Sequence, residues 1–191
     1  MKLSSDERMK LHAAIETAQA RTSARLAVVT VPISDHYKLY PLVYGGMTAF
    51  VAGAILATFF RHMPLREAFF LVAQAAAVVT FLLDIMTLRL AVVPRRAKLW
   101  ECWELAHRAF ASRILAQNDR KTGILVFVSL GERYVEVVTD RDVDRHIAQS
   151  VWDAIIKEFL AEAKAGRVGT ALPKMVEASA KVLEQYYPPN G

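Results

Sequence analysis

The stretch LVYGGMTAFVAGAILATFF, residues Leu42–Phe60, and the stretch AFFLVAQAAAVVTFLLDIMTLRLAVV, residues Ala68–Val93, determine the architecture of this chain. Each run reaches or exceeds the roughly 20 apolar residues that an α-helix needs to cross a bilayer. The connector Arg61–Glu67 is too short for a domain and predicts a turn. The pair therefore predicts a membrane-spanning helical hairpin whose two ends emerge on the same side.

The composition is typical of a small membrane protein with one soluble domain. The chain has 191 residues, 54% of them apolar, and the hairpin leaves enough chain for one domain of modest size. The net charge is +5, but the lysines and arginines cluster beside the apolar runs. This placement favours anionic lipid headgroups over nucleic acid as a partner. The single cysteine, Cys102, excludes an internal disulfide and suits a reducing compartment.

The segment before the hairpin predicts one helix and one strand. Ser4 and Glu7 have the spacing of a capping box, in which both side chains satisfy free backbone N–H groups. We therefore expect a one-faced helix over Ser5–Arg21. The β-branched run Leu26–Val31 predicts a strand that is covered on both faces. Because the first twenty residues are polar, no cleavable signal peptide is expected, and the hairpin must direct the chain to the membrane.

The segment after the hairpin predicts a helix and two strands. Apolar residues form one helical stripe over Ala97–Gln117. The clearest buried strand in the chain is Ile124–Val128. A turn at Leu130–Arg133 joins it to Tyr134–Val138, which alternates like a half-exposed strand.

Two more helices are expected before the chain ends. Apolar residues repeat every fourth position from Val143 to Leu160 and predict one continuous helix that faces the core. A last helix carries Leu172 to Tyr186. The fold class is therefore α/β: a small α/β/α sandwich split by an inserted transmembrane hairpin. Its parts are the first helix and strand at 1–36, the hairpin at 37–96, the remainder of the domain at 97–187 and a tail at 188–191.

Residues at the hairpin ends predict its orientation. Aromatic side chains of the type found at membrane interfaces flank the spans: Tyr37, Tyr40, Tyr44, Trp100 and Trp103. Cationic residues near the domain-side ends are Lys38, Arg89, Arg95, Arg96 and Lys98, against Arg61 and Arg66 in the turn. Because cytoplasmic segments carry the excess of lysine and arginine, the domain is predicted to face the cytoplasm, at the inner membrane of a bacterial cell.

Asp84 is the one acidic residue within an apolar run. An ionisable group inside a membrane often marks a transport pathway or a proton relay. Here Asp84 lies near the domain-side end with Arg89 close by, and two helices are too few to enclose a pathway without oligomerising. We therefore interpret the hairpin as an anchor and keep a transporter role for Asp84 as a third alternative.

The strand segments resemble a known family. Thr122–Ser129, followed by Arg133 and the alternating Val135–Val138, resembles the paired-strand core of the TPM-domain family. Ala165–Leu172 resembles the opening of the family's amphipathic helix, and Arg21–Val31 resembles its first strand. That family includes thylakoid-lumen phosphatase-like proteins and photosystem II repair factors. The closest resemblance is to short bacterial members in which a membrane hairpin splits the domain.

The resemblance raises the question of a cation site, because some family members are described as acid phosphatases or as cation-binding. The candidate ligands are Asp140, Asp142 and Asp144, whose oxygens could bind Ca²⁺ or Mg²⁺. The alternative is that these side chains cap a helix and complement its dipole. Gln149 stands where many members carry an aspartate, and this removes one negative ligand.

Two functions follow from these observations. The favoured hypothesis is a non-catalytic module, held at the cytoplasmic membrane face, that binds or assists other membrane proteins. The alternative is a divalent-cation-dependent acid phosphatase that acts near the membrane. The lipid bilayer is the expected partner, other membrane proteins are candidates, nucleic acid is not expected, and self-association is open. The histidines show no metal-ligand spacing, and Cys102 is expected to be a small buried side chain rather than a nucleophile.

Overall fold

The chain divides into two units that interleave along the sequence. The computed structural model describes residues 4–35, 37–60, 62–116 and 122–189. One unit, here the sheet unit, comprises Met1–Ser34 and Leu99–Gly191. The other, the hairpin unit, is Asp35–Lys98. The sheet unit is thus built from two segments that are far apart in sequence, and the hairpin unit is the insertion between them.

The sheet unit is organised around a three-stranded sheet with the order β1-β2-β3 within the described residues. Strand β1 (Arg25–Val31) runs parallel to β2 (Gly123–Ser129), which pairs antiparallel with β3 (Tyr134–Thr139). All three predicted strands are confirmed. Every residue of β2 is buried, because this strand has a neighbour on each side and a helical layer on each face.

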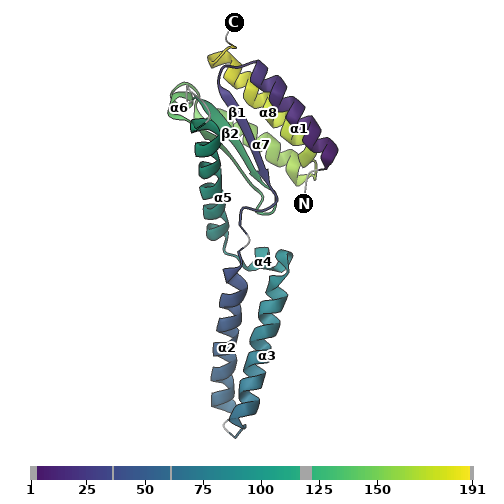
Figure 1. The fold of residues 1–191 in the computed structure, drawn as a ribbon, viewed down its shortest axis with the longest axis vertical. Coiled ribbons are helices and arrows are strands. Elements are labelled where there is room, and N and C mark those ends of the chain that lie inside the picture. Colours follow the sequence, from purple (N-terminus) through teal and green to yellow (C-terminus); the bar gives the residue numbers. More distant parts are fainter. Residues whose placement is uncertain (1–3, 36, 61, 117–121, 190–191) are drawn as a thin grey trace. The chain divides into compact units, whose positions relative to one another are not determined.

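Helices cover both faces of the sheet (Figure 1). One layer contains α1 (Ser5–Ala20), α7 (Gln149–Lys164) and α8 (Val168–Tyr186). The other contains α5 (Arg95–Phe110) and the π-helical turn η1 (Ala111–Leu115). The α/β class and the layered arrangement are therefore confirmed. The capping box is also confirmed, because Ser4 and Glu7 accept each other's backbone N–H groups.

Two apolar clusters fill the spaces between the layers, as strand alternation requires. Ile124 and Val126 of β2 pack with Trp152 and Val176 on the α1–α7–α8 side. The intervening residues Leu125 and Phe127 pack with α5 and η1, where the main partners are Cys102, Ala106, Phe110 and Ile114. Adjacent residues of one strand thus anchor opposite helical layers.

The hairpin unit consists of α2 (Leu39–Phe59), α3 (Leu65–Asp84) and the short α4 (Met86–Val92). Helices α2 and α3 are long and apolar enough to cross a membrane. They pack along each other, and Gly45 of α2 lies directly against Thr80 and the backbone carbonyl of Ala76. A side chain at Gly45 would collide there, so glycine permits the close approach of the two helices.

The second apolar run, Ala68–Val93, is divided between two helices. Ile85 has φ −65° and ψ 120°, an extended conformation that separates α3 from α4. Arg89 reaches back across this break, donates to the carbonyl of Asp84 at 2.8 Å and pairs with the Asp84 carboxylate. Its guanidinium supplies donors where the helical ladder is interrupted. The predicted proximity of Asp84 and Arg89 is therefore confirmed.

The predicted continuous helix from Val143 to Leu160 is wrong. Helix α6 (Arg141–His146) ends before Ile147, which has φ −124° and ψ 116°, and α7 starts at Gln149. Ile147 remains 2% exposed. The apolar spacing continues through the break because Ile147 still faces the core, so periodicity alone did not reveal it.

Candidate functional site

Asp140 caps helix α6 and ties it to strand β2. Its Oδ1 accepts the backbone N–H groups of Asp142 at 2.7 Å and of Val143 at 2.8 Å. Its Oδ2 accepts the backbone N–H of Gly123, the first residue of β2, at 2.5 Å. Asp140 is 8% exposed. One carboxylate therefore satisfies three backbone donors, as the capping alternative predicts.

Asp142 and Asp144 have different partners. Asp142 Oδ2 accepts the hydroxyl of Tyr187 at 2.9 Å, and its Oδ1 lies 3.9 Å from His146 Nδ1. Asp144 accepts the hydroxyl of Thr139. Burial, followed by the hydrogen bond to Asp142, raises the pKa of Tyr187, so this hydroxyl keeps its proton and donates. The turn thus joins the end of β3 to the end of α8.

A cation at this turn would have to join or displace these hydrogen bonds. Across the described ranges, no three His, Cys, Asp or Glu side chains are grouped in a way that could hold a metal ion. The site predicted at Asp140, Asp142 and Asp144 stays a prediction. Both oxygens of Asp140 are engaged by backbone donors, so Asp142 and Asp144 would have to contribute most of the binding.

A second polar cluster lies at the carboxyl ends of β1 and β2. Glu132 Oε1, in the β2–β3 turn, accepts the backbone N–H of Ser34 at 2.9 Å and its hydroxyl at 2.6 Å. Its Oε2 accepts the hydroxyl of the fully buried Ser129. The thiol of Cys102 donates to the Ser34 hydroxyl at 3.3 Å. The cluster links both parallel strands to α5. It lies at the carboxyl ends of the strands, where open α/β sheets commonly bind ligands.

The chemistry of this cluster is structural rather than nucleophilic. Burial raises the pKa of the Cys102 thiol from 9.0 to about 11, and the side chain is 0% exposed. A protonated, inaccessible thiol is a poor nucleophile. The expectation that Cys102 is a small buried side chain is therefore confirmed. Sequence reasoning missed Ser34, Ser129 and Glu132. The available signal was the position of the two serines, one directly after the β2 run and one shortly after the β1 run.

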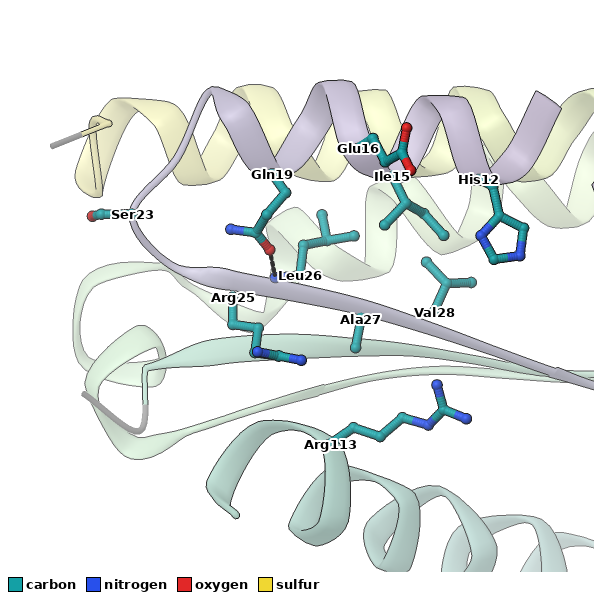
Figure 2. A pocket seen from close by; sticks show the side chains of 10 residues that line it. All are labelled: His12, Ile15, Glu16, Gln19, Ser23, Arg25, Leu26, Ala27, Val28 and Arg113. Atoms are coloured by element: carbon teal, nitrogen blue, oxygen red, sulfur yellow. Dashed lines mark hydrogen bonds between the residues drawn. The ribbon is translucent and has the colours of Figure 1, made fainter. Parts of the chain in front are cut away.

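A groove of the sheet unit lies along β1 (Figure 2). Its volume is about 580 Å³. Helix α1 forms one wall and Arg113 of η1 extends from the other, with the strand itself as the floor. The remaining lining residues are His12, Ile15, Glu16, Gln19, Ser23, Arg25, Leu26, Ala27 and Val28. The groove mixes charged groups with exposed strand backbone, as a peptide-binding surface does.

Comparison with known proteins identifies the family. The family model of the TPM domain matches residues 87–182, about half of the chain. The chain belongs to the TPM-domain family. The matched region contains β2, β3, most of α8 and the acidic turn, which is the segment Asp140–Asp144 at the start of α6. Strand β1 and helix α1 precede it, on the other side of the hairpin, and complete the fold of this TPM-domain protein.

A solved structure supports the same fold. The NMR structure of the BA42 protein from the psychrophilic bacterium Bizionia argentinensis aligns with a TM-score of 0.59 at 13% sequence identity. The alignment covers 100% of this chain and 87% of that chain. No curated protein matches this chain in sequence. The likeness to BA42 shows the fold of this TPM-domain protein, and the residues themselves must carry any statement on its function.

Proposed function

We propose that this TPM-domain protein is anchored by its hairpin in the inner membrane of a bacterium, and that its sheet unit binds other membrane proteins there without catalysing a reaction. The observation that carries the proposal is the exposed apolar surface of α2 and α3. Phe50, Phe59 and Phe81 are 80%, 78% and 75% exposed. Exposed apolar area costs about 25 cal/mol per Å² in water and nothing comparable in lipid, so a bilayer is the medium that suits these helices.

The non-catalytic part of the proposal rests on the two polar clusters. Each carboxylate of the acidic turn already accepts a hydrogen bond from the protein. In the second cluster, Glu132 holds two serines, and the neighbouring Cys102 is buried and protonated at neutral pH. Polar groups that are bound to one another in this way stabilise a fold, and they would have to be released before they could act on a substrate.

The cytoplasmic orientation rests on the charge distribution. Arg95, Arg96 and Lys98 lie at or near the start of α5, and Trp100 stacks on Trp103 in its next turns at 5.3 Å between ring centroids. Both tryptophans are exposed. Amphipathic aromatics beside cationic residues suit the headgroup region of a cytoplasmic leaflet.

Membrane fractionation tests the anchor. The full-length chain produced in bacteria is expected to stay in the membrane pellet after a carbonate wash and to be released by detergent. A variant with Phe50→Lys and Phe81→Lys is expected to leave the pellet, because a lysine costs about 3 kcal/mol at the centre of a span, where Phe50 lies, and Phe81→Lys near the end of α3 adds a smaller cost. The matched Phe50→Leu and Phe81→Leu variant should behave like the wild type. Carbonate release of the wild type would refute the anchor.

Cysteine labelling tests the orientation. Lys157 is exposed on α7, and Lys157→Cys in a Cys102→Ala background leaves one reactive thiol on the sheet unit. A membrane-impermeant maleimide is expected to label this thiol only after the inner membrane is opened. Labelling of intact spheroplasts would place the sheet unit outside the cytoplasm.

Enzymology and crosslinking separate the binding module from the phosphatase. We expect no phosphate release from generic phosphoesters in the presence of Ca²⁺ or Mg²⁺. Release that is lost when Asp140, Asp142 and Asp144 are all changed to Asn would favour the phosphatase instead. Photo-crosslinking in native membranes is expected to recover one reproducible partner protein, whereas recovery of only self-associated chain would contradict the proposal.

A further inference from the structure

Strand β1 is an edge strand, and its exposure differs from that of its neighbour. Within the described residues it pairs with β2 alone. Six of its seven residues are partly exposed, whereas all seven residues of β2 are buried. An edge strand presents a row of backbone donors and acceptors to whatever lies beside it. The groove of Figure 2 runs along this edge.

The hydrogen-bond pattern shows which backbone groups face the groove. The N–H of Arg25 donates to the carbonyl of Thr122, and the carbonyl of Val31 accepts the N–H of Leu130. In a parallel pair, alternate residues of a strand direct both of their backbone groups to the partner. The odd-numbered residues of β1 therefore bond to β2. The N–H and C=O groups of Leu26, Val28 and Thr30 point the other way, and Leu26 and Val28 line the groove.

The side chain of Gln19 already behaves as a substitute strand at the start of this edge. Its Oε1 accepts the N–H of Leu26 at 2.9 Å, and its Nε2 donates to the carbonyl of Ala24 at 2.9 Å. An added strand would bond to the same kind of donor and acceptor pair. Beyond Leu26, the outward N–H groups of Val28 and Thr30 have no hydrogen-bond partner among the described residues.

The two walls of the groove differ in chemistry. Side chains of Leu26 and Val28 pack on the α1 side, so Arg25, which alternates with them, points to the η1 side. Figure 2 shows Arg25 and Arg113 together on that side of β1. Arg113 is exposed and lines the groove. The α1 wall presents Ile15 together with His12, Glu16 and Gln19. One side of an inserted strand would therefore meet Arg25 and Arg113, and the other would meet Ile15 among polar and charged groups of α1.

We propose that the edge of β1 binds an extended segment of another protein as an added strand. The acidic side chains of this bound segment face Arg25 and Arg113, and its apolar side chains face Ile15 of α1. This proposal rests on the proposed function, because it names the surface and the partner chemistry of the binding module. The Val28 and Thr30 backbone groups supply the affinity, and the alternation of acidic and apolar residues supplies the specificity.

A second copy of this chain fits the groove less well. If β1 paired with its own copy, the side chains delivered to the η1 wall would be Arg25, Ala27 and Val29. None of these is acidic, so a second copy would bring no carboxylate to Arg25 and Arg113. The charge distribution therefore favours a different chain with carboxylates.

A peptide titration with residue-level hydrogen exchange tests the proposal. The full-length chain in detergent micelles is titrated with a short acetylated peptide that alternates glutamate with valine. We expect the Val28 and Thr30 amides to become protected from exchange, because they gain acceptors, and we expect no change at the amides of β3. A peptide in which lysine replaces glutamate should bind about tenfold more weakly.

Two variants locate the binding to this edge. Arg113→Glu should weaken binding of the glutamate peptide about tenfold and strengthen binding of the lysine peptide, whereas Arg145→Glu on the exposed surface of α6 should change neither. Val28→Pro removes an outward N–H without removing a ladder bond to β2, so the chain should fold and lose protection at Thr30. Equal binding by all of these proteins would overturn the proposal.

The remaining outcomes are distinguishable from a failure of the proposed function. If Val28 and Thr30 stay unprotected while photo-crosslinks from α6 or α7 capture a partner, the module binds elsewhere and the edge proposal is wrong. If both amides become protected without peptide as the chain concentration rises, the occupant is a second copy, and the proposal of an acidic partner segment is wrong.

Discussion

Helix α8 of the sheet unit and helix α3 of the hairpin unit have almost the same length, 19 and 20 residues, but opposite burial. Nine residues of α8 are buried, among them Leu172, Val176 and Leu183, whereas α3 has no buried residue. The apolar residues of α8 form a stripe with a polar side opposite, and those of α3 surround the helix. A helix of the first kind is built to pack on a core in water, and one of the second kind needs an apolar solvent.

The threonine hydroxyls of the hairpin and the polar clusters of the sheet unit differ in how far along the sequence their hydrogen-bond partners lie. In the hairpin, the hydroxyls of Thr48, Thr58 and Thr80 each donate to the carbonyl four residues earlier at 2.8 Å. In the sheet unit, polar side chains join segments that are far apart in sequence, as Glu132 joins Ser34. Local satisfaction suits a lipid medium, where no water replaces a missing partner. Long-range satisfaction fixes the layers of a folded domain.

Matched truncations should give the largest difference between the units. Phe127→Ala removes a fully buried ring of β2, and we expect the free energy of unfolding to fall by about 3–5 kcal/mol. Phe81→Ala removes an equally large ring that is 75% exposed, and we expect a change below about 0.5 kcal/mol in detergent. Urea unfolding of the whole chain in detergent, followed by tryptophan fluorescence for the sheet unit and by circular dichroism for the helices of the hairpin unit, measures both. Equal losses would mean that Phe81 is buried against protein.

Replacement of Asp140 tests a polar contact between segments that are far apart in sequence, and we expect an intermediate loss of stability. Asp140→Ala leaves three backbone donors without their acceptor, so we expect a loss of about 2–3 kcal/mol. Asp144→Ala is the control, because it removes one hydrogen bond at an exposed position and should cost less than about 0.5 kcal/mol. Thermal unfolding measures both effects.

Thermal unfolding also tests the predicted cation. If Ca²⁺ or Mg²⁺ binds this turn, millimolar cation should raise the unfolding temperature of the wild type, because a ligand that binds the folded state stabilises it. The increase should disappear when Asp140, Asp142 and Asp144 are all changed to Asn. An increase of equal size in that variant would place the cation elsewhere.

The sequence predicted those elements whose signal is local and continuous. The first apolar run, the Ser4 capping box and the buried strand around Val126 each depend on neighbouring residues alone, and each is found as predicted. The breaks at Ile85 and Ile147 were missed because the apolar pattern runs through both of them. At Ile85 the break in the helix is bridged by the ion pair of Arg89 with Asp84. At Ile147 the break lies within the apolar core of the sheet unit.

The candidate sites were predicted less completely, because their residues meet only through the fold. The sequence brought Asp140 to attention as a charge cluster but could not show that Gly123, 17 residues earlier, donates to it. It provided no reason to connect Ser34 with Glu132, which are 98 residues apart in sequence, one before the hairpin and the other after it. The outward backbone groups of β1 depend on the register with β2, which a single sequence does not specify.

The smallest effect is expected at Cys102, and it appears only at alkaline pH. The pKa of the thiol is raised in the folded chain from 9.0 to about 11, because burial disfavours the thiolate. The resulting stabilisation is fully present below pH 9 and is lost as the pH rises through 11. Relative to Cys102→Ala, the wild type should therefore lose about 1–2 kcal/mol of unfolding free energy between pH 9 and pH 11.

Comparison with the Cys102→Ala variant isolates this thiol from other groups that titrate in the same range. Burial also raises the pKa of Tyr134, which is present in both proteins, and the charge of the Cys102 thiolate is the smallest cause of that rise, so Tyr134 contributes little to the difference. Urea unfolding at a series of pH values gives the difference directly. A difference that stays constant from pH 7 to pH 11 would mean that the thiol reaches solvent in the folded chain. The polar cluster at the ends of β1 and β2 would then be open, and a reactive role for Cys102 would have to be reconsidered.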